Sequence, residues 1–292
     1  MTEPGEFALD RAGVRASFDR ASATYESAAG LQAQVAAELL GRLDGFGLGP
    51  RTVLDLGAGT GRGARALKQR YPRATVIALD LAPGMLREAQ RHQPRWRKFA
   101  RVCADAQRLP LAAASVDLVF SSLMLQWCEP LDAAFAEVQR VLRPGGFFAF
   151  STLGPATLAE LRSAWAQADG HNHVNHFIDM HDVGAALMRA GLSEPVLDVD
   201  RIELSYPHAR ALMRDLKRIG AHNVTAGRPH GLTGRARLAR MEQAYEAFRR
   251  EGSLPATYEV IYGAGWGSGA RPVAPGSETV IAPDAIRRTV RR

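Results

Sequence analysis

Apolar residues recur along this chain with two different spacings. Over residues 14–40 they fall on one face of a helix, whereas further on short apolar runs, typical of buried strands, alternate with segments of helical spacing. The expected strands are 51–56, 74–80, 100–104, 116–121 and 146–152, and the expected helices are 61–70, 83–92 and 130–141. This alternation predicts an α/β domain, a doubly wound Rossmann-like sheet that is mostly parallel and has helices on both faces.

The second half of the chain follows a looser pattern. We expect helices at 180–190, 207–220 and 232–250 and strands at 196–204 and 257–263. The chain is accordingly divided into an N-terminal helical lid over 1–45, a core over 46–206, a helical insertion over 207–251, the last core strand in 252–263 and a tail over 264–292. The tail is rich in Gly, Pro, Ala and Arg without periodicity, so we expect it to be disordered.

A glycine-rich turn follows the first expected strand. Residues 53–61 read Val-Leu-Asp-Leu-Gly-Ala-Gly-Thr-Gly. Without β-carbons, Gly57, Gly59 and Gly61 let the chain bend sharply and let a ligand lie against the peptide plane. The turn therefore predicts a site for a nucleotide-like cofactor at the end of this strand.

Three acidic residues near the strand ends favour S-adenosylmethionine as that cofactor over a dinucleotide or another nucleotide. A nearby carboxylate would repel a pyrophosphate, whereas adenosylmethionine carries an ammonium and a sulfonium. We expect Asp55 to face this cationic end, Asp80 to accept hydrogen bonds from both ribose hydroxyls, and Asp105 to accept one from the adenine amino group. The other expected cofactor residues are Leu81, Met85, Ala106, Ser122 and Gln126.

The composition gives the chain a positive net charge, and the absence of certain motifs argues against nucleic-acid and membrane binding. The 292 residues include 37 Lys and Arg against 30 Asp and Glu, a formal charge of +7, which suits an acidic partner. No nucleic-acid recognition motif, membrane-spanning apolar run or signal pattern is evident, so we expect a cytoplasmic protein that binds neither nucleic acid nor membrane. Cys103 and Cys128 are expected to be reduced, mostly buried thiols and neither zinc ligands nor nucleophiles.

Segments outside the cofactor motifs resemble one family in particular. They are Ser17-Phe-Asp-Arg-Ala-Ser-Ala-Thr-Tyr-Glu26, Leu125-Gln-Trp-Cys128, Thr152-Leu153, Glu160-Leu-Arg-Ser-Ala-Trp165, His173-Val-Asn-His-Phe177, Leu216-Lys-Arg-Ile-Gly-Ala221 and Leu232-Thr233. Over residues 12–263 the chain resembles the malonyl-[acyl-carrier protein] O-methyltransferases of biotin synthesis, members of the class-one S-adenosylmethionine-dependent methyltransferases. It departs from the family pattern at Ala58, where relatives also have cysteine, and in the tail after Trp266.

The resemblance implies a sheet whose last strand is antiparallel, and a defined reaction. The family transfers a methyl group to the free carboxylate of malonyl-acyl-carrier protein, and the ester then passes through fatty-acid synthesis toward pimelate. Because a carboxylate is already ionised at neutral pH, we expect no general base, and catalysis should rest on alignment. The expected partner is an acyl-carrier protein bearing malonyl-phosphopantetheine, with malonyl-coenzyme A as the alternative substrate, and the expected oligomeric state is a monomer.

The acceptor site is expected under the 207–251 insertion, beside the lid. Tyr25 would reach the cofactor or the substrate, and Trp127 would wall the pocket for the pantetheine arm or pack under the lid. A cation or hydrogen-bond donors must hold the substrate carboxylate. The candidate cations are Lys217, Arg218 and Arg228, whereas Arg143, in a turn shared by many methyltransferases, is interpreted as structural.

A histidine-rich stretch raises the alternative of a metal site. His171, His173, His176 and His181 are closely spaced, but no cysteine accompanies them, and methyl transfer to an ionised oxygen needs no Lewis acid. We therefore expect no metal. His173 and Asn175 are interpreted as hydrogen-bond donors in the acceptor pocket, with a loop-bracing role as the alternative.

Two other functions remain open from the sequence. One is methylation of a small free acid of the trans-aconitate type, for which a basic surface beside the pocket would have no use. The other is a non-catalytic protein that binds S-adenosylmethionine, which an occluded acceptor pocket would favour.

Overall fold

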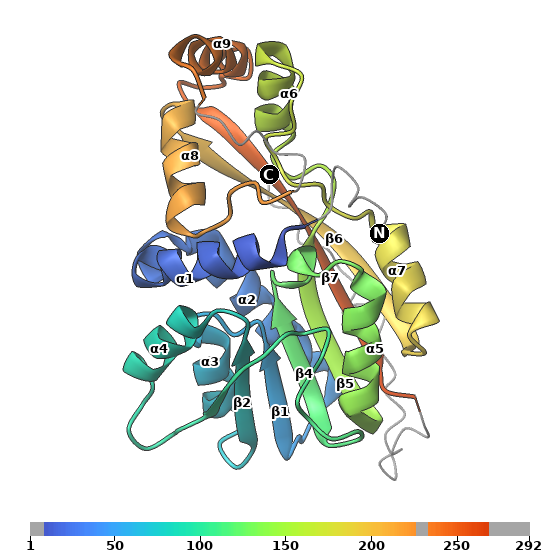
Figure 1. Ribbon diagram of the computed structural model, residues 1–292. Coiled ribbons are helices and arrows are strands. Elements are labelled where there is room, and N and C mark those ends of the chain that lie inside the picture. The colour runs from blue at the N-terminus through green and yellow to red at the C-terminus, as the bar shows by residue number, and fades with distance from the viewer. Residues whose placement is uncertain (1–8, 226–232, 269–292) are drawn as a thin grey trace.

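The computed structural model describes residues 9–225 and 233–268, and its centre is a seven-stranded sheet (Figure 1). The strand order is β3-β2-β1-β4-β5-β7-β6, and neighbouring strands are parallel except that β7 runs antiparallel to both β5 and β6. The bounds are β1 Thr52–Leu56, β2 Thr75–Asp80, β3 Ala100–Cys103, β4 Val116–Ser122, β5 Leu142–Leu153, β6 Ser193–Tyr206 and β7 Leu254–Trp266. The predicted doubly wound α/β fold with an antiparallel last strand is confirmed.

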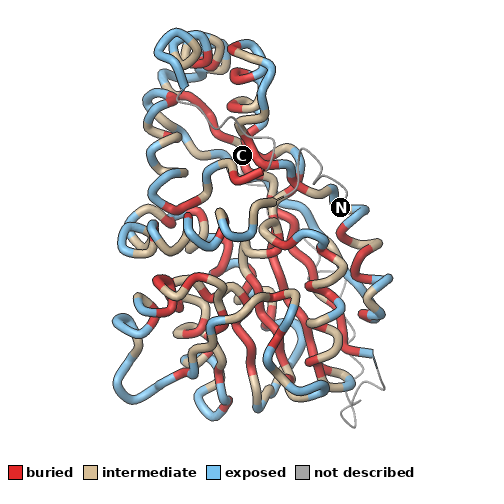
Figure 2. Tube along the Cα trace, in the orientation of Figure 1, coloured by how far each residue is buried: buried red, intermediate tan, exposed pale blue. Residues whose placement is uncertain are grey.

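The central strands are apolar because helices cover both faces of the sheet. Val53, Leu54 and Leu56 of β1 are fully buried, and Figure 2 shows buried residues concentrated along the strands. Helices α2, α3 and α4 cover one face, and α5 and α7 cover the other. Their bounds are α2 Gly30–Arg42, α3 Arg62–Arg70, α4 Pro83–Arg91, α5 Leu131–Val141 and α7 Met180–Arg189. With both faces covered, the carboxyl ends of the parallel strands are the place where side chains can meet a ligand.

A second group of helices stands beyond these carboxyl ends (Figure 1). It consists of α6 Ala159–Ala168, α8 Ala209–Arg218 and α9 Arg235–Glu246. The paired strands β6 and β7 run up into this group, and Trp165, Leu212 and Tyr245 are buried where they meet it. The sequence analysis did not include α6 as a helix. It also ended the last strand at residue 263, whereas β7 continues to Trp266 because it pairs with β5 and β6 up to that residue.

The N-terminal helical region is divided into two helices. α1 Arg11–Ala28 ends at Ala29, whose φ of −87° and ψ of 47° lie outside the helical region, and α2 begins at the next residue. Whereas α2 packs on the sheet, α1 lies between α4 of the sheet layer and α8 of the upper group. The chain thus places one N-terminal helix across the carboxyl ends of the strands.

The two cysteines lie in different environments. Cys128 is buried, and burial raises the pKa of its thiol to about 12. The expectation of a mostly buried thiol is wrong for Cys103, which is exposed because it ends β3, the strand at one edge of the sheet. Within the described part of the chain, no helix is long and apolar enough to cross a membrane. Most of the expected disordered tail, residues 269–292, lies outside the described residues.

Candidate active site

Three glycines shape the turn after β1. Gly57, Gly59 and Gly61 have φ angles of 77°, 53° and 79°, in the left-handed region. A β-carbon on Gly57 would lie 2.2 Å from the Met124 side chain, whereas a β-carbon on Gly59 would have nothing within 4 Å. Packing therefore requires a glycine at position 57, while at position 59 the bare backbone borders open space that a ligand can approach.

Asp80, at the end of β2, holds this turn through backbone hydrogen bonds. Its Oδ2 accepts from the N–H of Gly59 and its Oδ1 from the N–H of Ala82, both at 2.8 Å. Burial raises the pKa of the Asp80 carboxyl, and these N–H groups oppose that rise. Each oxygen keeps a second lone pair, so Asp80 can still accept hydrogen bonds from two hydroxyl groups of a ligand.

A cavity lies beside Asp80 at the carboxyl ends of the strands. Its volume is ≈ 100 Å³, which is below the roughly 300–1,000 Å³ of typical ligand sites, so its walls must move apart when a cofactor-sized ligand enters. The predicted cofactor residues that line it are Gly57, Asp80, Leu81, Met85, Asp105, Ala106 and Ser122. The fold thus brings most of the predicted cofactor residues to one place.

The other two acidic residues, Asp55 and Asp105, differ from Asp80 in their burial and in their contacts. Asp55 lies under the glycine turn and does not line the cavity; it is 3% exposed, and its Oδ2 has no hydrogen-bond partner. Burial raises the pKa of the Asp55 carboxyl to about 7. Asp105 lines the cavity and forms an ion pair of 3.3 Å with Arg11 of α1. The sequence analysis did not find Arg11, because its approach depends on the tertiary position of α1.

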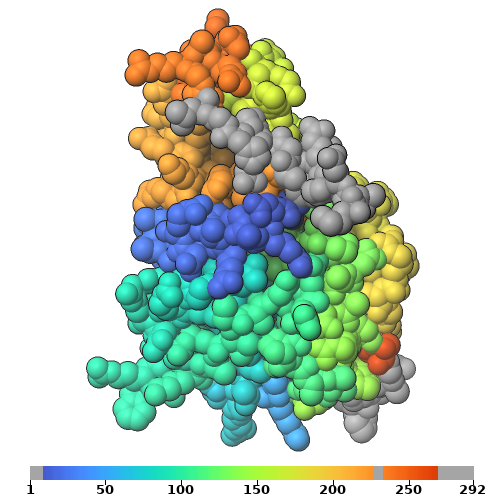
Figure 3. All heavy atoms as spheres, viewed as in Figure 1, coloured from blue at the N-terminus to red at the C-terminus, as the bar shows by residue number. Residues whose placement is uncertain are grey.

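Polar contacts fasten α1 over the cavity. Figure 3 shows α1 as a band between the sheet layer and α8. Glu26 of α1 accepts hydrogen bonds from Thr60 at 2.8 Å and Arg65 at 3.0 Å, and it pairs with Arg62. Burial opposes ionisation of Glu26, but these hydrogen bonds and the Arg62 charge outweigh it and lower the pKa of its carboxyl. The adjacent Tyr25, which lines the cavity, is therefore carried on a fastened helix.

A second small space, here called the passage, lies between this cavity and a larger cleft and shares lining residues with both. The passage has a volume of ≈ 50 Å³ and the cleft one of ≈ 780 Å³. Tyr25 and Trp127 line both the cavity and the passage, and Asn175 lines both the passage and the cleft. Gln126, which was expected beside the cofactor, lines the passage. Because they share lining residues, the three spaces adjoin one another in the order cavity, passage, cleft.

The cleft is lined by α1, α6, α8 and the segments that follow them, and it is basic. The predicted Lys217 and Arg218 line it, and so do Arg20 and Arg214, which the sequence analysis did not single out. No Asp or Glu is among its lining residues in the described part of the chain. Neither Lys217 nor Arg218 lines the passage, and Arg228 lies outside the described residues.

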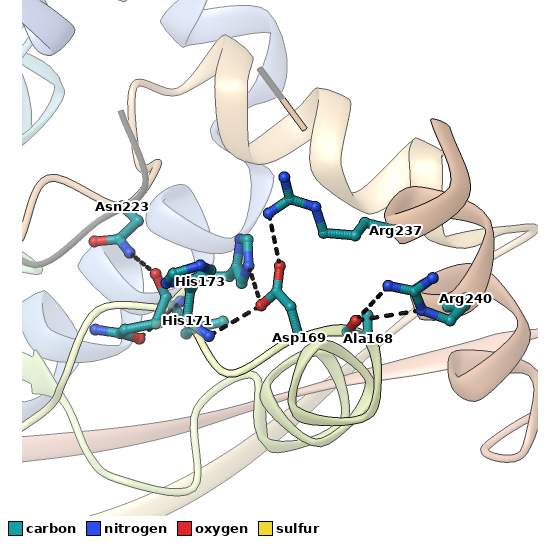
Figure 4. A network of polar contacts seen from close by, with 9 residues as sticks. Ala168, Asp169, His171, His173, Asn223, Arg237 and Arg240 are labelled. Carbon is teal, nitrogen blue, oxygen red and sulfur yellow. Dashed lines mark hydrogen bonds and ion pairs between the residues drawn. The ribbon is translucent and has the colours of Figure 1, made fainter. Parts of the chain in front are cut away.

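A polar network braces one wall of the cleft around His173 (Figure 4). The His173 Nε2 lies 2.9 Å from Oδ1 of Asp169, and the imidazole stacks on Trp165 with ring centroids 3.8 Å apart. Asp169 also pairs with Arg237 of α9 at 3.4 Å, which ties the end of α6 to that helix. Within the described ranges, no three residues are grouped as metal ligands. His173 therefore braces the loop and lines the cleft at the same time.

Arg143 has a structural partner. Its Nη1 lies 2.6 Å from Oδ1 of Asp117, whose Oδ2 accepts the backbone N–H groups of Arg51 and Thr52. Arg143 lines none of the three spaces, in agreement with its structural interpretation.

Comparisons with known proteins agree with this geometry. Residues 54–150 match the family described as "Methyltransferase domain". The chain is 56% identical over 280 residues to the malonyl-[acyl-carrier protein] O-methyltransferase of Laribacter hongkongensis, covering 93% of this chain and 94% of that protein. It is 54% identical to the protein of the same name from a Methylovorus species, covering 92% and 93%. Among solved structures, the YcgJ protein of Bacillus subtilis aligns with a TM-score of 0.58 at 17% identity, over 80% of this chain and 100% of that one.

Proposed function

This chain belongs to the malonyl-[acyl-carrier protein] O-methyltransferase family, and we propose that it methylates the free carboxylate of malonyl-acyl-carrier protein with S-adenosylmethionine as the methyl donor. The observation that carries this proposal is the order of the three adjoining spaces, from the cofactor cavity past the narrow passage to the basic cleft. The substrate has the same order: a carboxylate at its tip, a thin phosphopantetheine arm behind it and an acidic protein at its base.

The residues around the cavity fit S-adenosylmethionine. Asp80 offers acceptors to the ribose hydroxyls, Asp105 offers one to the adenine amino group, and the open space beside Gly59 admits the ligand to the backbone. The Asp55 carboxyl, whose Oδ2 has no hydrogen-bond partner, lies under the turn, and its ionised form would favour the cationic amino-acid end. When bound, S-adenosylmethionine supplies a methyl carbon on a positively charged sulfur, and its transfer forms an oxygen–carbon bond as the carbon–sulfur bond breaks with its electrons left on sulfur.

The protein has to align the carboxylate oxygen with the methyl carbon and the sulfur and to exclude water. The reaction requires no proton transfer. The malonyl carboxylate is ionised at neutral pH. No residue lining the passage in the described part of the chain is charged, so no general base stands there. The hydrogen bond from Thr60 to Glu26 holds α1 beside the cavity, which favours a fixed geometry of the reacting atoms.

The cleft accounts for the other expected substrate residues. Asn175, at the boundary of passage and cleft, is placed to donate from its amide to a carbonyl of the thioester or of the arm. His173 and Trp165 form a stacked wall beside the arm. Lys217 and Arg218 would attract the acidic carrier protein from the exposed end of the cleft. In this proposal the residues 1–45 act as the lid, the 207–251 segment caps the acceptor site, and the ester product enters biotin synthesis.

The test is to incubate the purified protein with S-adenosylmethionine labelled in the methyl group and one acceptor at a time. The acceptors are malonyl-acyl-carrier protein, malonyl-coenzyme A, free malonate and trans-aconitate. We expect base-labile methyl ester on the malonyl thioesters and little on the free acids, because only the thioesters occupy the passage and the cleft together. Comparable rates on a free acid would support the small-acid function, and tight cofactor binding without transfer would support a non-catalytic one.

A further inference from the structure

The methyl donor and the acceptor can meet where the cofactor cavity adjoins the passage, a place here called the junction and defined by the residues that line both. Phe18, Tyr25, Leu123 and Trp127 line both the cofactor cavity and the passage. A methyl group carried in the cavity and a carboxylate arriving through the passage come into contact only at this junction. The groups that orient the carboxylate must therefore be found among these four side chains or their immediate neighbours.

Among the described residues no cation lines the passage, and Arg62, whose charge acts on the nearby Tyr25 hydroxyl, is paired with Glu26. The passage is lined only by apolar and uncharged polar side chains, and the cations of the acceptor side, including Lys217 and Arg218, line the outer cleft. Of the residues lining the cofactor cavity, Arg11 carries a positive charge, but it is paired with Asp105. A carboxylate at the junction must therefore be held by hydrogen-bond donors that carry no charge.

Two of the four junction residues carry such donors. Among the described residues, Asp55 Oδ2 and Asn172 Nδ2 are the only buried polar side-chain atoms without a partner. Among the described residues, no hydrogen bond is formed by the Tyr25 hydroxyl or the Trp127 indole N–H, and neither atom is among the buried unpartnered ones, so both are accessible and available as donors. Burial and the nearby Asp80 charge raise the pKa of Tyr25, so its hydroxyl keeps the proton that it would donate.

Resting on the proposed function, we propose that the malonyl carboxylate is held by the Tyr25 hydroxyl and the Trp127 indole N–H, and that Lys217 and Arg218 do not contact it. The neighbouring Gln126 is engaged elsewhere, since its Nε2 donates to the Leu123 carbonyl at 2.7 Å and its Oε1 accepts from Thr152 at 3.3 Å.

Both donors are held in place by contacts of their own. Tyr25 precedes Glu26, which fastens α1 to Thr60 and Arg65. The backbone N–H of Trp127 donates to the Met124 carbonyl at 2.9 Å, and its ring meets Phe18 edge to face at a centroid distance of 5.2 Å. Uncharged donors fix the carboxylate without the full desolvation of a buried ion pair, and they leave its oxygens more reactive than a bound cation would.

The experiment compares two thioesters that differ only in the carboxylate. Binding of malonyl- and acetyl-acyl-carrier protein is measured by calorimetry with S-adenosylhomocysteine present, for the wild type and the variants Tyr25→Phe and Trp127→Phe. A loss of packing weakens both thioesters, whereas a loss of a carboxylate donor weakens the malonyl thioester alone. Lys217→Met and Arg218→Met are the matched variants that remove a cation of the cleft, and S-adenosylhomocysteine affinity is measured for every protein.

We expect the wild type to prefer the malonyl thioester, and each donor variant to reduce that preference by about 10- to 100-fold, as for a hydrogen bond to a charged group. The Lys217→Met and Arg218→Met variants should weaken both thioesters alike and leave the preference intact. The proposal is overturned if the preference survives in Tyr25→Phe and Trp127→Phe, or if it disappears in either cleft variant. A wild type that methylates no malonyl thioester would instead refute the proposed function, so the two failures are distinguishable.

Discussion

The cofactor cavity and the acceptor cleft lie on either side of α1 and are built in opposite ways. The cavity is small, contains the carboxylates of Asp80 and Asp105, and is held by backbone hydrogen bonds at the ends of sheet strands. The cleft is larger, contains cations, and is braced by side-chain contacts such as the one between Asp169 and His173. Because the sheet fixes the position of each strand end, a single carboxylate in the cavity can form defined hydrogen bonds to the cofactor. In the cleft, several exposed cations attract the carrier protein together, so the loss of any one of them should change binding less.

The largest effect expected from this difference is at Asp80. Asp80→Ala removes the acceptor of both ribose hydroxyls, and each such hydrogen bond contributes roughly 1.5–3 kcal/mol. We therefore expect S-adenosylmethionine affinity to fall by at least about 100-fold, measured by calorimetry. Asp80→Asn, which keeps one oxygen acceptor, should lie between the wild type and Asp80→Ala. An unchanged affinity in Asp80→Ala would remove this residue from the cofactor site.

The raised pKa of Asp55 should make the free energy of unfolding depend on pH. Its folded-state pKa of about 7 lies above the ordinary value of 3.8, so the folded state binds the proton more tightly and loses stability as pH rises from about 4 to about 7. Asp55→Asn removes this loss, and we expect the free energy of unfolding without cofactor to rise by about 4 kcal/mol at pH 8 and by only about 2 kcal/mol at pH 5.5. Denaturant unfolding at the two pH values measures both numbers.

Asp117 provides the matched control of opposite sign. Although burial opposes its ionisation, Arg143 and the N–H groups of Thr52 and Arg51 lower the pKa of Asp117, so its ionised form stabilises the fold above its ordinary pKa. Asp117→Asn should therefore destabilise the protein at pH 8. If Asp55→Asn also destabilises it there, the hydrogen bond from the Ala64 N–H and the charge of Arg65 outweigh the cost of burying the Asp55 carboxylate.

Loss of the Glu26 contacts should have an intermediate effect, because these contacts hold α1, which carries Tyr25, to Thr60, Arg62 and Arg65. Glu26→Gln removes the charge that Arg62 and Arg65 contact, and we expect S-adenosylmethionine affinity to fall about 10-fold, in line with one hydrogen bond to a charged group. Calorimetry measures this change. Glu38→Gln, which removes a partner of Arg42 on α2, is the control and should leave the affinity unchanged. Equal losses in the two variants would mean that α1 is not specifically fastened by Glu26.

The smallest effect is expected in the cleft. Lys217→Glu should raise the Michaelis constant for malonyl-acyl-carrier protein by about 2- to 5-fold at low salt, and the difference should shrink as salt screens surface charge over ~8 Å at physiological ionic strength. Arg97→Glu makes the same charge change on the exposed loop between α4 and β3, away from the cleft. If both variants respond alike, the net charge of the protein and not the cleft attracts the carrier protein.

The cofactor half and the family could be predicted from the sequence. The apolar runs, the glycine turn and the acidic residues at the strand ends each depend on neighbours close in sequence, and parallel strands bring their carboxyl ends to one edge of the sheet. Once the strands were recognised, the approach of Asp80 to the turn of Gly59 followed, because their strands are adjacent in such a fold.

The acceptor half, in contrast, depends on contacts between segments that are far apart in the sequence. Residues from α1, the short 3-10 helix η2 (Leu125–Trp127) and the segment after α6 form the junction and the passage. No spacing in the sequence shows that Tyr25, Trp127 and Asn175 line adjoining spaces. For the same reason the sequence pointed to Lys217 and Arg218 as candidates to hold the carboxylate, although they line the outer cleft, and it did not reveal Arg11 or Arg20. Side-chain contacts between distant segments depend on how helices pack across the sheet, and that packing is a property of the whole fold.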